Sequence, residues 1–202
     1  MHAGWDAACE LGAIGPDDER GRRFGRMGPG ACLLFPQGAI YNEHLVHVGA
    51  QTIVGPGTSI SAGMAPGQKM PTDPVVSIGS RCLIGRGSHI VGHWEIVVGD
   101  DIQTGPYVYI TDQNHTYVDP VEPIGRQWPT EAAVCIGSGS WLGANAVILP
   151  GTQIGEHVVV AAGAVVRGEI PDRCVVAGVP ARIVRRWVEG RGWVDEKDLT
   201  LS

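Results

Sequence analysis

The sequence has few aromatic residues and few charges. Aromatic side chains make up 6% of its 202 residues and charged side chains 18%, although 44% of the residues are hydrophobic. The core must therefore come from small and β-branched side chains, and 30 glycines with 14 prolines require many tight turns, which argues against an ordinary helical bundle. The low charge and the even spread of Val, Ile and Leu argue against a disordered chain. At this length we expect one domain.

Long apolar runs and paired cysteine motifs are also missing. No apolar stretch reaches the roughly 18 residues that cross a bilayer, and residues 1–12 lack the basic start and apolar stretch of a signal peptide. The five cysteines form no CxxC pair and are expected to be reduced core residues. A net charge of -6 disfavours nucleic acid and anionic membranes as partners. We therefore expect a cytoplasmic protein without an integral membrane segment.

An aliphatic residue followed by glycine recurs at spacings built on six residues. Three such hexads form an 18-residue unit, and five units can be written. In each unit the first hexad has glycine after the aliphatic residue and the third has none, so the three sides of a unit are distinguishable from the sequence. The units start at Val48, Ile78, Val98, Ile136 and Ile154.

This pattern predicts a parallel β-helix, a triangular coil with a short strand on each of three sides. The aliphatic residues are expected to point inward, and glycine is expected at corners that need a positive φ. Two long insertions, 66–77 and 116–135, follow the third side of their units and should leave the prism at one corner as ordered, proline-containing loops. Function is expected beside this wall of loops; decorative insertions in a scaffold are the alternative.

The second half of the chain carries motifs of a known family. Residues 141–155 (WLGANAVILPGTQIG), 162–166 (AGAVV) and 177–182 (AGVPAR) resemble the hexapeptide-repeat acyltransferases, in the branch of galactoside and maltose O-acetyltransferases and their polysaccharide-modifying relatives. Residues 111–120 (TDQNHTYVDP) are similar to the catalytic stretch of that group. The resemblance implies an all-β fold, a left-handed parallel β-helix of about five triangular coils with two protruding loops and a short C-terminal extension.

The handedness comes from the resemblance alone, because the general preference for right-handed crossovers predicts the opposite. We expect an N-terminal cap over residues 1–37, the β-helix acyltransferase domain over 38–184 and a C-terminal tail over 185–202.

The family implies a CoA thioester donor, acetyl-CoA by preference, and a hydroxyl acceptor that meet between the subunits of a homotrimer without a metal. His115 would be the base, since it closes the third hexad of its unit just before the long insertion. An imidazole can take the hydroxyl proton at neutral pH and return it to the leaving thiolate. Asp112 is the expected orienting partner of the ring, although a backbone carbonyl would serve equally. The alternative is an exposed loop histidine bonded to Asp112 or Asp119.

The same resemblance assigns the CoA contacts by position. Trp141 and Ala144 would lie near the pantetheine arm, with Ala162 beside it and Arg182 or Arg185 at the phosphorylated nucleotide end, because arginine gives paired, charge-assisted hydrogen bonds to phosphate. Packing at a subunit interface is the alternative for Trp141, and a solvated strand face is the alternative for the arginines.

Two departures from the family limit the assignment. Arg167 and Gly168 replace its usual threonine and lysine, so one expected CoA contact is either lost or taken over by Arg167. Gly87 stands near the position of an acceptor-binding asparagine, and residues 1–37 do not resemble the helical acceptor module of galactoside enzymes. A sugar of a cell-envelope glycan, or its lipid-linked precursor, therefore fits better than a simple galactoside.

Two rival functions stay open at this stage. A carbonic anhydrase-like hydratase would use His89, His93 and His115 as zinc ligands between subunits, but the closely spaced histidine pair expected in that class is missing. A non-catalytic scaffold would need neither a histidine before the loop nor an outward tryptophan.

Overall fold

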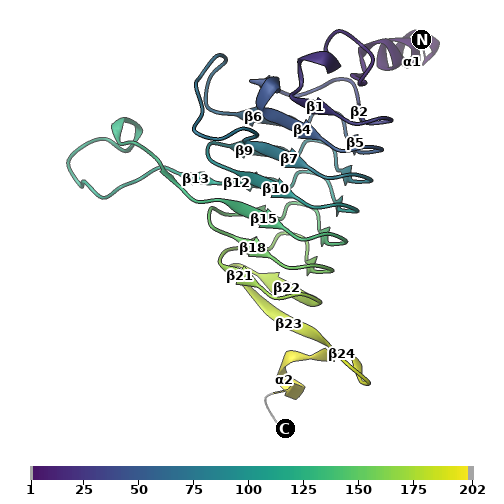
Figure 1. Cartoon of the computed structure of the whole chain (residues 1–202). Helices are drawn as coiled ribbons and strands as arrows, with labels where there is room; N and C mark the ends of the chain where they lie inside the picture. Colours follow the sequence, from purple (N-terminus) through teal and green to yellow (C-terminus); the bar gives the residue numbers. More distant parts are fainter. Residues whose placement is uncertain (1, 200–202) are drawn as a thin grey trace.

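The computed structural model describes residues 2–199 and shows a three-sided prism built from short parallel strands, with helices only at its ends and in its loops (Figure 1). Each turn of the chain adds one strand to each of three sheets, so parallel neighbours in a sheet lie 16 to 38 residues apart in sequence. This is the arrangement of a parallel β-helix.

The first sheet holds, in spatial order, β1 (Arg26–Met27), β4 (Val46–Val48), β7 (Val76–Ile78), β10 (Ile96–Val98), β15 (Val134–Ile136), β18 (Gln153–Ile154) and β21 (Glu169–Ile170). The second sheet holds β2 (Cys32–Leu33), β5 (Ile53–Val54), β8 (Leu83–Ile84), β11 (Gln103–Thr104), β16 (Trp141–Leu142), β19 (Val159–Val160), β22 (Cys174–Gly178), β23 (Ala181–Val188) and β24 (Gly192–Asp195). The third sheet holds β3 (Ile40–Tyr41), β6 (Ser59–Ala62), β9 (His89–Gly92), β12 (Tyr109–Thr111), β17 (Val147–Ile148) and β20 (Val165–Val166). The remaining elements are α1 (His2–Gly12), η1 (Gly21–Arg23), η2 (Glu43–Leu45), the antiparallel pair β13 (Gln113–Asn114) and β14 (Thr130–Glu131), η3 (Ile124–Arg126) and α2 (Glu196–Leu199).

The core is the narrow interior of the prism. The aliphatic residues that start the five predicted units are all buried, and each is the last residue of its strand in the first sheet. Small or β-branched residues also line the interior, as predicted at the fifth hexad positions; Cys82, Ser88, Ala146, Thr152 and Ala164 are all buried.

The prism extends beyond the five units at both ends. Strands β1 and β2 lie within the 1–37 segment that the sequence predicts as a cap, and β21 and β22 continue the stack after the fifth unit. The repeat pattern misses these turns because Met27 replaces a branched aliphatic residue and Pro171 replaces the glycine that follows the inward residue. At the C-terminal end, β23 and β24 reverse direction and join the second sheet antiparallel.

The regular spacing of the corner glycines has a different cause from the predicted one. The positive φ belongs to the residue two positions later, such as Arg81 and Asp101, both with φ of 57°. The glycines themselves are required by the close stacking of successive turns. A Cβ atom on Gly137, for example, would lie 2.5 Å from both the carbonyl carbon and the carbonyl oxygen of Gly155.

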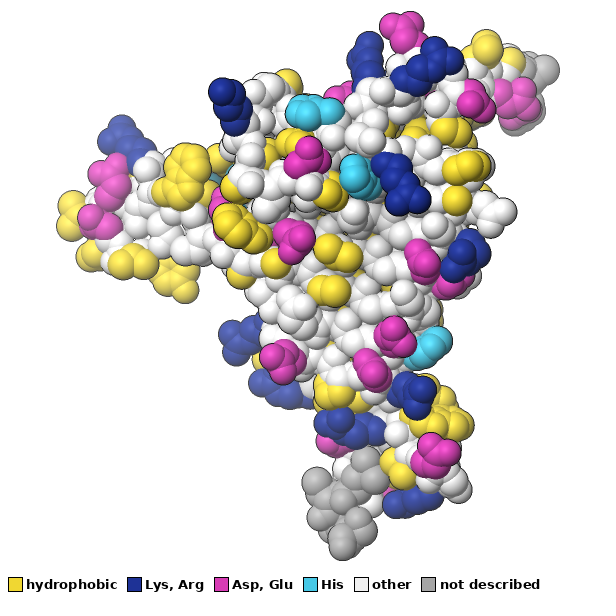
Figure 2. Space-filling model, in the orientation of Figure 1, with side chains coloured by type: hydrophobic (Ala, Val, Ile, Leu, Met, Phe, Trp, Pro, Cys, Tyr) yellow, Lys and Arg dark blue, Asp and Glu magenta, His cyan; other side chains and the backbone are white. Residues whose placement is uncertain are grey.

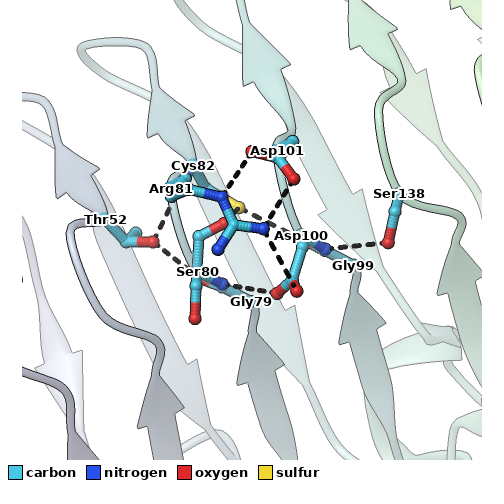
Figure 3. A network of polar contacts seen from close by, with 9 residues as sticks. All are labelled: Thr52, Gly79, Ser80, Arg81, Cys82, Gly99, Asp100, Asp101 and Ser138. Atoms are coloured by element: carbon cyan, nitrogen blue, oxygen red, sulfur yellow. Dashed lines mark hydrogen bonds and ion pairs between the residues drawn. The ribbon is translucent and has the colours of Figure 1, made fainter.

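Polar side chains tie these corners together along the prism (Figure 3). The Ser80 amide donates to Asp100 Oδ1 at 2.7 Å, and the Asp100 amide donates to Ser138 Oγ at 3.0 Å. Beside this ladder, Arg81 donates from Nε and Nη2 to the two oxygens of Asp101, each at 2.7 Å. The guanidinium lowers the pKa of Asp101. Side-chain hydrogen bonds therefore connect these successive turns in addition to the backbone hydrogen bonds between strands.

Two insertions leave the prism where the third sheet passes to the first. Residues 63–75 join β6 to β7, and residues 112–133 join β12 to β15. We call residues 113–131 the arm; it projects well away from the prism (Figure 1). Among the described residues, no helix has the length and apolar character needed to cross a membrane.

Candidate active site

His115 lies at the root of the arm and is exposed. It follows β13 directly, and β13 pairs with β14 through only two residue pairs, Gln113 with Glu131 and Asn114 with Thr130. The ring therefore stands just beyond the last paired residue, where the arm begins to project. Within residues 2–199 the His115 ring has no hydrogen-bond partner, so it is free to meet a ligand.

Asp112 is buried, and its carboxylate faces the prism rather than the arm. Its Oδ1 accepts the amide of His93 at 2.8 Å, and its Oδ2 accepts the amides of Trp94 and Glu95, each at 2.8 Å. Burial raises the pKa of Asp112, although these hydrogen bonds oppose the shift. No hydrogen bond joins Asp112 to His115 in the part of the chain that the structure describes, and the orienting role of Asp112 stays a prediction.

The structure does not bring the three histidines of the hydratase alternative together. His93 is fully buried with its Nδ1 3.5 Å from Glu131 Oε1. His89 lies on the outer face of the third sheet, with its ring centroid 6.5 Å from that of Tyr109. Over residues 2–199 no group of three or more His, Cys, Asp or Glu side chains is placed to hold a metal ion.

Trp141 and Arg185 belong to one row across the second sheet. Trp141 pairs with Val159, Val159 with Val175, and Val175 with Arg185. Trp141 is 52% exposed and points outward, as predicted. Three strand spacings separate the ends of this row, about 14 Å. The Arg185 Nε lies 3.1 Å from Asp195 Oδ1, so this arginine already has a carboxylate partner.

The other predicted CoA contacts lie in three places. Ala144 and Ala162 stack in successive turns between the second and third sheets, where the Gly163 amide donates to the Ala144 carbonyl at 2.9 Å. Arg182 is exposed on β23. Arg167 follows β20 at the corner between the third and first sheets, away from the Trp141 row. The structure therefore separates Arg167 from Arg182.

His115 and the Trp141 row lie on different parts of the prism. The arm leaves at the corner between the third and first sheets, whereas Trp141 and Arg185 lie on the second sheet, which is the side opposite that corner. His115 of one chain therefore cannot face the Trp141 row of the same chain. A site that uses both needs a second copy.

Sequence comparisons identify the repeats. The family described as bacterial transferase hexapeptide (six repeats) matches residues 136–168, and the hexapeptide repeat of succinyl-transferase matches residues 75–111. The chain is 42% identical over 106 residues to the putative lipopolysaccharide biosynthesis O-acetyl transferase WbbJ of Escherichia coli, a match that covers 49% of this chain and 54% of that protein. It is 32% identical to the galactoside O-acetyltransferase of Escherichia coli over 54% of this chain and 56% of that protein. The matches thus span about half the length of these relatives.

Solved structures share the fold over most of the chain. A mutant of AntD, an N-acyltransferase from Bacillus cereus in complex with dTDP and coenzyme A, superposes with a TM-score of 0.71 at 18% identity, covering 94% of each chain. A maltose O-acetyltransferase from Clostridium difficile gives a TM-score of 0.55 at 22% identity, covering 86% of this chain and 78% of that one. At these identities the solved structures show the fold alone, whereas the matched repeats and the relatives support membership of the hexapeptide-repeat acetyltransferase family.

Proposed function

We propose that this protein transfers an acetyl group from acetyl-CoA to a hydroxyl of a sugar, in a cell-envelope glycan or its lipid-linked precursor. The observation that carries the proposal is the exposed, unpartnered His115 at the root of the arm, on a prism whose sequence relatives are named O-acetyltransferases. The similarity to a lipopolysaccharide O-acetyl transferase supports the choice of a glycan acceptor. Use of acetyl-CoA fits a cytoplasmic location.

The reaction needs one base and no covalent enzyme intermediate. His115 takes the proton of the acceptor hydroxyl while the oxygen attacks the thioester carbonyl. The tetrahedral intermediate collapses with cleavage of the carbon–sulfur bond, and the thiolate of CoA receives the proton from His115. Positioning and backbone N–H groups that face the oxyanion supply the remaining stabilisation.

The donor is proposed to lie along the second sheet, with its pantetheine arm near Trp141, Ala144 and Ala162. Its phosphorylated end then reaches Arg185 or Arg182 at the end of the row. Arg167 lies at a different corner of the same chain, so its contribution to CoA binding requires that a neighbouring chain presents it.

We propose a homotrimer, with left-handed coils as in the family and the threefold axis parallel to the prisms. The separation of His115 from the Trp141 row supports a site shared between chains. The arm also exposes large apolar side chains that a neighbouring chain would cover (Figure 2). These are Tyr117, Val118, Val121, Ile124 and Trp128.

The proposal is tested with acetyl-CoA, a panel of sugar and glycan acceptors and detection of the released thiol. Replacement His115→Ala should lower transfer by about two to four orders of magnitude, the usual contribution of a general base, while CoA binding and the oligomeric state are kept. His89→Ala, which removes an exposed histidine from β9, is the matched control. Unchanged turnover in His115→Ala would remove the assigned mechanism.

A further inference from the structure

His93 is a buried histidine that the reaction described above does not use. It is 0% exposed, and neither Nδ1 nor Nε2 has a hydrogen-bond partner among the described residues. Buried polar groups are nearly always satisfied, because an unpaired one loses its hydrogen bonds to water without replacement. A fully buried ring with two unpaired nitrogens therefore requires a functional or structural reason.

The surroundings of the ring are acidic and belong to the root of the arm. Glu131 Oε1 on β14 lies 3.5 Å from His93 Nδ1, slightly beyond hydrogen-bond length. Asp112, at the end of β12, holds the backbone amide of His93 and interacts electrostatically with its ring. A small rotation of Glu131 would bring its carboxylate within hydrogen-bond length of the ring.

The arm needs such an attachment because its own pairing is short. Strands β13 and β14 share only two residue pairs, and a ladder of that length is marginal on its own. The prism side of the corner, in contrast, is firmly held, since Asp112 accepts the amides of residues 93–95 and Thr72 Oγ1 donates to the Trp94 carbonyl. His93 therefore stands on the fixed side and Glu131 on the projecting side.

We propose that His93 and Glu131 form a latch that fixes the root of the arm and thereby positions His115. The inference rests on the proposed function only in the role of His115. His93 is a positioning residue in this scheme: it touches β14, β14 pairs with β13, and β13 leads directly into His115. A hydrogen bond to a carboxylate is roughly twice as strong as a neutral one, so replacing Glu131 by glutamine should weaken the latch.

Amide hydrogen exchange of residues 113–131 in the full-length protein tests the latch without reference to activity. After correction for the intrinsic rates, Glu131→Gln should speed exchange at the root of the arm about tenfold. Glu122→Gln is the matched control, because Glu122 lies farther out on the same arm beside Arg126. Equal exchange in wild type and Glu131→Gln would overturn the latch.

A second pair of variants addresses the histidine itself. His93→Leu should speed exchange as Glu131→Gln does, and the double variant should be no worse than either single one, since the two residues act through one contact. His89→Leu on the same strand is the control. If His93→Leu does not fold, Glu131→Gln still decides the question, because Glu131 is partly exposed.

Measurements of acetyl transfer then distinguish a failure of the latch from a failure of the proposed function. With His115 as the base, Glu131→Gln should lower kcat while the KM for acetyl-CoA stays within about twofold, because a positioning effect acts on the chemical step rather than on donor binding. If exchange responds as expected but wild type transfers no acetyl group, the latch stands and the proposed function falls. If wild type transfers acetyl groups and exchange does not respond, the latch falls alone.

Discussion

Gly137 has no space for a side chain, because the backbone of the next turn lies against its α-carbon. An added Cβ would lie 2.5 Å from the carbonyl atoms of Gly155, and neither backbone can move without disturbing the strands on both sides. We expect Gly137→Ala to lower the free energy of unfolding by about 2–3 kcal/mol, the upper part of the usual range for overpacking. Thermal unfolding measures this change. Gly125→Ala on the arm, where no atom lies within 4 Å, should have little effect.

Asp112 provides a second residue-scale prediction. In Asp112→Asn one carboxylate oxygen becomes an NH₂ group that faces backbone amides, so we expect a loss of about 1–3 kcal/mol in stability. Because burial raises the pKa of Asp112, the folded protein binds its proton more tightly than the unfolded chain does. The stability of wild type relative to Asp112→Asn should therefore decrease as the pH rises through that raised pKa. Unfolding measured from pH 3 to pH 8 checks the sign. A drop in kcat with unchanged stability would instead support the role of Asp112 in orienting His115.

Sequence reasoning at this scale identified residue types better than their contacts. The hexad glycines were expected from their spacing, but the turn-to-turn approach that requires them is visible only once the coils are stacked. Likewise Asp112 and His115 are three residues apart in sequence, yet the carboxylate binds the amides of residues 93–95 from the preceding turn. The burial of His93 gave no sequence signal, since its partner Glu131 lies on the returning strand of a long insertion.

The arm is an element that we expect the prism not to need for folding. The Ala132 amide donates to the Asp112 carbonyl at 2.8 Å, so a short glycine turn can replace residues 113–131. The register of β10 with β15 remains available after the deletion. We expect the shortened chain to keep its β content by circular dichroism and to lose acetyl transfer, because His115 and the apolar arm residues are gone.

A milder truncation serves as the control for the arm. Removal of residues 117–128 alone keeps β13, His115 and Glu131, and should preserve slow exchange at the arm root while weakening self-association. Loss of β content in the longer deletion would mean that the arm is part of the folding unit.

The strands themselves were predictable because the aliphatic residue of each hexad is the one that the strand buries. All five unit starts end strands of the first sheet, and the third side of each unit is buried at its aliphatic position. The turns at either end were not predicted, because their residues depart from the hexad pattern. The antiparallel hairpin of β23 and β24 follows no hexad, so the periodicity of the sequence could not predict its position.

At the scale of the whole molecule, two features favour a neighbouring chain: the arm exposes apolar side chains, and His115 lies on a different part of the prism from the Trp141 row. We expect light scattering to give the mass of a homotrimer, and the doubly substituted Tyr117→Ser, Trp128→Ser protein to shift toward smaller species, because exposed apolar area is then lost from the arm.

Mixed trimers provide a sharper measurement. His115→Ala chains combined with chains defective in the Trp141 row should regain activity if each site takes His115 from one chain and the donor row from another. An active monomer would contradict the arrangement.

The donor row leads to a final prediction at its far end. Arg185 forms an exposed ion pair with Asp195 at 3.1 Å, and such pairs contribute only about 0–1 kcal/mol. A phosphate group of CoA can therefore displace Asp195 at small cost. We expect Arg185→Ala to weaken CoA binding by about 1.5–3 kcal/mol, the range for a hydrogen bond to a charged group, and to raise KM more than it lowers kcat, because a contact remote from the reacting carbonyl stabilises ground and transition states alike. Asp195→Asn should tighten binding by up to about fivefold, since it removes the competing carboxylate. Titration calorimetry with CoA and dephospho-CoA measures both effects, and the Arg185→Ala loss should be smaller for dephospho-CoA if the contact is to the ribose phosphate. Equal affinities in wild type and both variants would mean that Arg185 only covers the strand face.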